Sequence, residues 1–85
     1  MGVIKMNNVE RLNNLVIKIL EIAARELIDS KKVADIPNWN SFNNLLIISS
    51  VEEEFKIQFT TEEIIKVVTY GDIKQLLRKH GVQIE

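Results

Sequence analysis

Very few residues of this 85-residue chain could do chemistry through their own side chains. The chain contains one histidine, His80, and no cysteine, so chemistry by a protein thiol is excluded. A triad of Ser41, His80 and Asp72 can be written, but nothing in the sequence brings the start of one helix next to the end of another. A histidine in the last turn of a helix commonly interacts with the helix dipole instead. The sequence therefore supports no catalytic triad.

Three consecutive acidic residues, Glu52, Glu53 and Glu54, are the next candidates. On a helix they spread over about 200°, so they cannot form a paired-carboxylate site. The sequence has neither a His-Glu-x-x-His motif nor the alternating acidic loop that binds calcium. Its three glycines are too scattered for a phosphate-binding loop. We therefore expect no catalytic residue and no metal site, and the protein is not predicted to be an enzyme.

The serine in PNWNSFNNLLII, residues 37–48, has two interpretations. Asn40 is a good N-cap, which places Ser41 at the first position of a helix. Taken alone, an Asn-Ser pair of this kind usually starts a helix and does nothing more, a contribution of about 1 kcal/mol. Alternatively, the Ser41 hydroxyl is the point where another group is attached. The surrounding pattern has to decide between these two hypotheses.

Apolar residues at helical spacing predict four helices, over residues 7–28, 41–55, 61–66 and 70–80. The loop after the first helix contains the only proline, Pro37, which disfavours helix at the residue before it. The expected N-caps are Asn7 or Asn8, Asn40, Thr60 or Thr61, and Thr69. No strand pattern competes. The predicted fold is all-α, a small four-helix bundle made by a single domain of residues 1–85.

Composition and charge limit the kinds of partner. The formal net charge is −1, and five of the 12 acidic residues lie between Glu52 and Glu63. No basic stripe is present that could neutralise phosphates, so we expect no nucleic-acid binding. The longest apolar run, Leu45 to Ile48, is far too short to span a membrane. The N-terminus is too weakly apolar for a secretory signal, so a cytoplasmic protein with protein partners is expected.

Residues 35–59, DIPNWNSFNNLLIISSVEEEFKIQF, resemble the acyl carrier protein family. That family usually has Trp-Asp-Ser-Leu at the start of its second helix, and this chain has Trp39-Asn40-Ser41-Phe42. An apolar helix, the segment EEEF and an Ile-x-Phe connection follow without a gap. Downstream, TTEEIIKVVTYGDIKQLL is similar to the short third helix and the fourth helix of the family. The resemblance extends over roughly residues 7 to 80.

This resemblance implies that Ser41 is the attachment point of 4'-phosphopantetheine. A phosphopantetheinyl transferase would join the Ser41 hydroxyl to the phosphate of that group, taken from coenzyme A. The thiol of the arm would hold an acyl or aminoacyl group as a thioester. A loading ligase and downstream transferases or synthases would then be the partners, in the biosynthesis of a lipid, polyketide, peptide or modified sugar. A stand-alone carrier that visits several enzymes is expected to be a monomer.

The resemblance also assigns residues that flank the arm or contact partners. Asn40 replaces the usual aspartate, which removes a negative charge beside the attachment point. Phe42 would lie partly exposed beside the arm and touch partner enzymes, with a core position as the alternative. Glu52 and Glu53 would pair with basic residues of partners, with a solvated helix face as the alternative. The second function hypothesis is an unmodified carrier-fold module that binds a protein through the acidic surface between residues 52 and 63.

Overall fold

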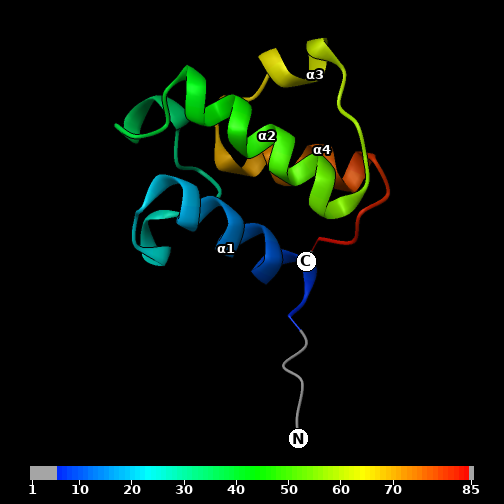
Figure 1. The fold of residues 1–85 in the computed structure, drawn as a ribbon, viewed down its shortest axis with the longest axis horizontal. Coiled ribbons are helices and arrows are strands. Elements are labelled where there is room, and N and C mark those ends of the chain that lie inside the picture. The colour runs from blue at the N-terminus through cyan, green and yellow to red at the C-terminus, as the bar shows by residue number, and fades with distance from the viewer. Residues whose placement is uncertain (1–5, 85) are drawn as a thin grey trace, which may run out of the picture.

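The computed structural model describes residues 6–84 and contains four α-helices in this range. They are α1 (Asn8–Leu20), α2 (Ser41–Phe55), α3 (Thr61–Ile65) and α4 (Tyr70–Lys79) (Figure 1). Two single turns of 310 helix lie in the long connection between α1 and α2, at Ala24–Glu26 and Val33–Asp35. The described residues form no strand, only an isolated bridge between Lys32 and Thr69. The prediction of a small all-helical bundle is confirmed.

Helices α1 and α2 lie side by side and run in opposite directions (Figure 1). Arg11, near the start of α1, forms an ion pair of 2.7 Å with Glu54, near the end of α2. At the other end of the pair, the Asn38 side chain donates a hydrogen bond of 2.8 Å to the carbonyl of Leu20, the last residue of α1. The two contacts fix both ends of α2 against α1.

Each helix begins where a side chain caps it. The capping residues, which accept a hydrogen bond from a backbone N–H in the first turn, are Asn7, Asn40, Thr60 and Thr69. In α1, α3 and α4 an acidic side chain three residues later also accepts from the N–H of the capping residue. Because these hydrogen bonds are local, the sequence predicted the starts of the helices to within one residue, and the structure selects Asn7 over Asn8 and Thr60 over Thr61 as caps.

The predicted first helix, residues 7–28, is wrong in its second half. Helix α1 ends at Leu20, because Glu21 adopts a left-handed conformation with φ 56° and its N–H bonds to the Ile17 carbonyl. The chain then makes a turn whose Leu27 side chain is buried in the core. The helical spacing of apolar residues continues beyond Leu20 in the sequence because apolar residues of the turn pack into the same core. The other helices start as predicted and end within one residue of their predicted ends.

One core connects the four helices and the long loop. From α2 it takes Ile47, Ile48 and Val51, and from α4 it takes Ile73 and Leu77. The loop contributes two large side chains, Ile36 and Trp39. The core therefore includes the loop as well as the helices, and Trp39 is buried in it.

The close approach of α4 to the loop gives a first prediction. The Gly71 N–H donates to the Asp29 carbonyl at 2.8 Å, and a Cβ on Gly71 would lie only 2.9 Å from that oxygen. We expect Gly71→Ala to lower the free energy of unfolding by about 1–3 kcal/mol, since backbone must move to admit the methyl group. Helix propensity alone predicts a gain of up to about 1 kcal/mol.

Urea denaturation followed by circular dichroism measures this change. Gln75→Ala, at an exposed position of the same helix, is the matched control and should change the free energy of unfolding by less than about 0.5 kcal/mol. A Gly71→Ala protein at least as stable as the parent would contradict the packing described for Asp29.

Candidate functional site

Ser41 occupies the first position of α2 and its side chain is exposed. Asn40 precedes it in an extended conformation and caps the helix: its side-chain oxygen accepts from the Asn43 N–H at 2.8 Å, and its carbonyl accepts from the Asn44 N–H at 2.8 Å. The N–H groups of the first turn that precede Asn43 have no partner within the helix. The Ser41 hydroxyl therefore lies in solvent at the positive end of a 15-residue helix.

A network of asparagine side chains fixes this end of α2. Asn43 donates from its side chain to the Asn38 carbonyl at 2.7 Å, and Asn38 in turn donates to the carbonyl of Leu20. The Trp39 indole N–H donates to the side-chain oxygen of Asn44 at 2.9 Å. The start of α2 is thus joined to the loop before it and to the end of α1. This network was not predicted from the sequence, although the four asparagines between residues 38 and 44 were a signal for it.

The structure places Phe42 beside Ser41 and leaves 73% of it exposed, so its alternative as a core residue is excluded. Ser41, Asn40 and Phe42 therefore lie together at one end of α2. Glu52 and Glu53 lie near the other end, about 16 Å away along the helix axis. Asn40 is exposed like Ser41, and no acidic residue lies in the first turn of α2.

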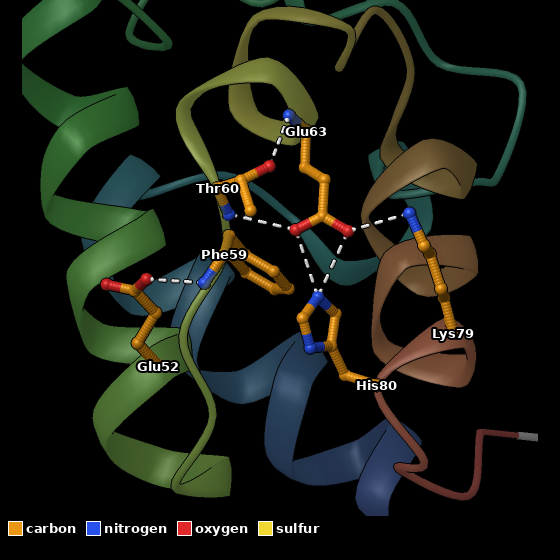
Figure 2. A network of polar contacts seen from close by, with 6 residues as sticks. All are labelled: Glu52, Phe59, Thr60, Glu63, Lys79 and His80. Carbon is orange, nitrogen blue, oxygen red and sulfur yellow. Dashed lines mark hydrogen bonds and ion pairs between the residues drawn. The ribbon is translucent and has the colours of Figure 1, made fainter.

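The three consecutive glutamates have different surroundings. Glu52 is half-buried, and its carboxylate accepts the Phe59 N–H at 2.8 Å, which fixes the connection after α2 (Figure 2). Glu54 is held by Arg11. Glu53 is exposed and makes no ion pair within residues 6–84. Of the two glutamates assigned to partners, Glu53 is the one whose carboxylate is directed to solvent.

A second polar cluster surrounds Glu63 in α3 (Figure 2). This side chain is buried, with the whole residue only 8% exposed, and its carboxylate has three donors. It accepts the Thr60 N–H at 2.9 Å, His80 Nε2 at 3.0 Å and Lys79 Nζ at 3.0 Å. The Phe59 ring packs edge-on against the imidazole, with the centroids 5.2 Å apart. His80 therefore links the end of α4 to α3, a contact that the sequence analysis did not foresee.

The donors around Glu63 keep its carboxylate ionised. The hydrogen bond from the Thr60 backbone, followed by those from His80 and Lys79, lowers the pKa of Glu63 from 4.5 to about 2. At the start of α4, the N–H groups of Thr69 and Val68 similarly lower the pKa of Asp72. Both carboxylates accept hydrogen bonds that cap or join helices. The role of the Glu63 cluster is therefore structural.

His80 and Asp72, two members of the triad considered from the sequence, have different partners. Asp72 accepts from backbone at the start of α4, and His80 contacts Glu63 at the end of that helix, about 12 Å further along its axis. Among the described residues, no hydrogen bond or ion pair connects His80 or Asp72 to Ser41.

The described residues were also searched for a metal-binding cluster and for a membrane-spanning helix. Residues 6–84 contain no cluster of three or more acidic or histidine side chains that could hold a metal ion. No helix in this part of the chain is long and apolar enough to cross a membrane. No protein-family model matches the chain.

The Glu63 cluster predicts a specific loss of stability in acid. A carboxyl group whose pKa is lowered on folding stabilises the protein above its unfolded pKa, and this stabilisation is lost as the pH falls through the folded value. We therefore expect the free energy of unfolding to fall between pH 4.5 and about 2. Glu63→Gln should weaken this dependence on pH, with Asp72 responsible for part of what is left.

Thermal unfolding across this pH range, followed by circular dichroism, tests the assignment. Glu62→Gln is the matched control, because Glu62 is an exposed residue of the same helix, and it should keep the slope of the parent protein. Equal slopes for the two variants would show that Glu63 is not the group that titrates.

Proposed function

We propose that the protein is a stand-alone carrier that holds an acyl or aminoacyl group on a 4'-phosphopantetheine arm attached to Ser41. The observation that supports this most directly is the position of the Ser41 hydroxyl, exposed at the N-terminus of α2 on a helix end held by the asparagine network. A transferase can reach such a hydroxyl without unfolding any part of the bundle. The resemblance of residues 35–59 to carrier proteins is the reason for proposing 4'-phosphopantetheine as the attached group.

The residues around Ser41 fit a phosphodiester. The positive end of a helix favours an anion, and the first turn of α2 contains no acidic side chain to oppose it. Asn40 and Asn43 supply neutral amides at this end. In the attachment step, the Ser41 oxygen would bond to the phosphorus that bears the pantetheine, the pyrophosphate bond of coenzyme A would break, adenosine 3',5'-bisphosphate would leave, and the hydroxyl proton would pass to a base of the transferase. The attached arm would supply the thiol that the chain lacks.

The residues that the resemblance assigns to partner binding also fit such a carrier. Phe42 offers an exposed apolar surface next to the attachment point. Glu53 offers an unpaired carboxylate to basic residues of a loading ligase or of a downstream transferase or synthase. Exposed pairs of this kind guide encounter and orientation more than they add affinity. Glu52 is already engaged with Phe59, so we assign it a smaller part in partner binding.

A second candidate function is an unmodified carrier-fold module that binds another protein. Two observations favour it. Asn40 stands where the carrier family usually has an aspartate, and large apolar side chains are exposed on α2 and around α3. These side chains are Phe42, Leu45, Leu46, Ile65 and Val68. Whether Ser41 accepts the arm distinguishes the two functions.

Intact-protein mass spectrometry tests the carrier function directly. After incubation with coenzyme A and a broad-specificity phosphopantetheinyl transferase, we expect a mass gain of one phosphopantetheine per chain. Ser41→Ala should show no gain, and Ser49→Ala, an exposed serine later in the same helix, should gain as much as the parent. No gain by a folded parent protein would count against the carrier function.

An Asn40→Asp variant examines the effect of the missing charge. Because Asn and Asp cap helices about equally well, this substitution should leave the fold unchanged. We expect faster attachment if the transferase and its metal use the aspartate. Failure of both the parent and Asn40→Asp would leave the unmodified module as the better hypothesis.

A further inference from the structure

Asn40 is the only asparagine of the chain that is followed by a small residue, Ser41. Each of the others is followed by Asn, Val, Leu or Trp. An asparagine side chain lies within reach of the backbone nitrogen of the next residue, and attack by that nitrogen on the side-chain carbon releases the amide as ammonia. A small next residue leaves room for the attack. The pair Asn40-Ser41 is therefore the place in this sequence where the reaction meets the least steric hindrance.

The backbone nitrogen that would attack Asn40 is free. Ser41 is the first residue of α2, so its N–H precedes the hydrogen bonds of the helix, and within residues 6–84 it donates no hydrogen bond. In contrast, the N–H of Trp39, which follows Asn38, donates to the Ile36 carbonyl at 2.9 Å. The fold therefore engages the nitrogen beside Asn38 and leaves the nitrogen beside Asn40 available.

The surroundings of the Asn40 amide stabilise the charge that the attack produces. Attack on the side-chain carbon moves negative charge onto the side-chain oxygen. This oxygen accepts the Asn43 N–H at 2.8 Å and lies at the positive end of α2. A fixed donor and a helix dipole directed at a developing negative charge both lower the barrier to its formation. Asn40 is also exposed, so water and base can reach it.

Asn7 caps α1 in the same way and provides an internal comparison. It is exposed and extended, and its side-chain oxygen accepts the Glu10 N–H at 2.8 Å. However, it is followed by the larger Asn8, and the Glu10 carboxylate accepts the Asn7 N–H at 3.1 Å. A negative charge this close opposes a second one on the Asn7 oxygen. The first turn of α2 contains no acidic residue, so this opposition is absent at Asn40.

We propose that Asn40 is a site of spontaneous deamidation, which converts the neutral cap of α2 into an acidic one. Base in the solvent removes the N–H proton of Ser41, and the nitrogen bonds to Cγ of Asn40. The bond from Cγ to the amide nitrogen breaks, and ammonia leaves with a proton taken from water, which gives a succinimide ring. Water then opens the ring. Cleavage between the ring nitrogen and Cγ leaves aspartate at position 40, and cleavage between the ring nitrogen and the main-chain carbonyl carbon leaves isoaspartate.

The aspartate product would place a negative charge beside the Ser41 hydroxyl. Asp caps a helix about as well as Asn, and a carboxylate at the positive end of a helix is stabilising, so this product keeps the fold. The carriers that residues 35–59 resemble usually have an aspartate at this position. An effect on the attachment of phosphopantetheine rests on the proposed function of Ser41, whereas the deamidation itself does not.

The experiment follows the unmodified protein for weeks in mildly alkaline buffer. Anion-exchange chromatography separates the acidic form, and the Asn40→Asp variant marks where this form elutes. Peptide mapping by mass spectrometry locates the change, and a synthetic peptide of residues 37–44 gives the rate without the fold. We expect a form with one additional negative charge, with aspartate and isoaspartate at position 40, at a rate comparable with that of the peptide. Circular dichroism verifies that the protein stays folded.

Three variants identify the reacting groups. Asn40→Ser keeps a capping side chain and should lose the acidic form. Asn7→Ser is the matched control at the other exposed cap, and it should produce the acidic form at the rate of the parent protein. Ser41→Val should slow the reaction severalfold, because a branched side chain crowds the attacking nitrogen.

Three results would overturn the proposal. The first is a folded protein that stays unchanged while the peptide is converted, which would show that the capping hydrogen bond protects Asn40. The second is an acidic form that persists in Asn40→Ser or that maps to another asparagine. The third is a Ser41→Val variant that reacts as fast as the parent. None of these measurements uses a transferase, so their failure is distinguishable from a failure of Ser41 to accept phosphopantetheine.

Discussion

Helix α3 has five residues, too few to be stable by itself, and the Glu63 carboxylate holds it in the bundle. The same carboxylate caps α3 through Thr60 and joins it to His80 and Lys79 at the end of α4. A buried carboxylate without partners would be costly, so the donors that surround Glu63 stabilise the folded protein. The position of α3 therefore depends on the end of α4 through the contacts of Glu63.

Neutral amide side chains hold the start of α2, whereas charged side chains hold α3. Asn38, Asn43 and Asn44 connect the start of α2 to the loop and to the end of α1, without an ion pair among them. The surroundings of Ser41 are therefore set mainly by the positive end of the helix. The free carboxylate of Glu53 lies at the far end of α2. This separation keeps the negative charge that could attract a partner away from the proposed phosphodiester.

Features that depend on neighbouring residues in the sequence could be predicted, and those that depend on distant contacts could not. The starts of the four helices and the exposure of Ser41 follow from local capping by Asn40 and its counterparts. The end of α1 depends on the left-handed Glu21 and on Asn38, which is 18 residues after Leu20. The pairing of His80 with Glu63 spans 17 residues and has no local pattern. Apolar periodicity also could not tell a helix from a compact turn that packs Leu27 into the same core.

The composition of the outer face of α2 bears on how partners would be recognised. Two leucine side chains of this helix, Leu45 and Leu46, are 61% and 43% exposed. An apolar side chain contributes little long-range attraction to basic partners, which mainly sets the association rate. It adds short-range apolar burial, which mainly slows dissociation. An exposed apolar surface of this kind is typical of a site that another protein covers.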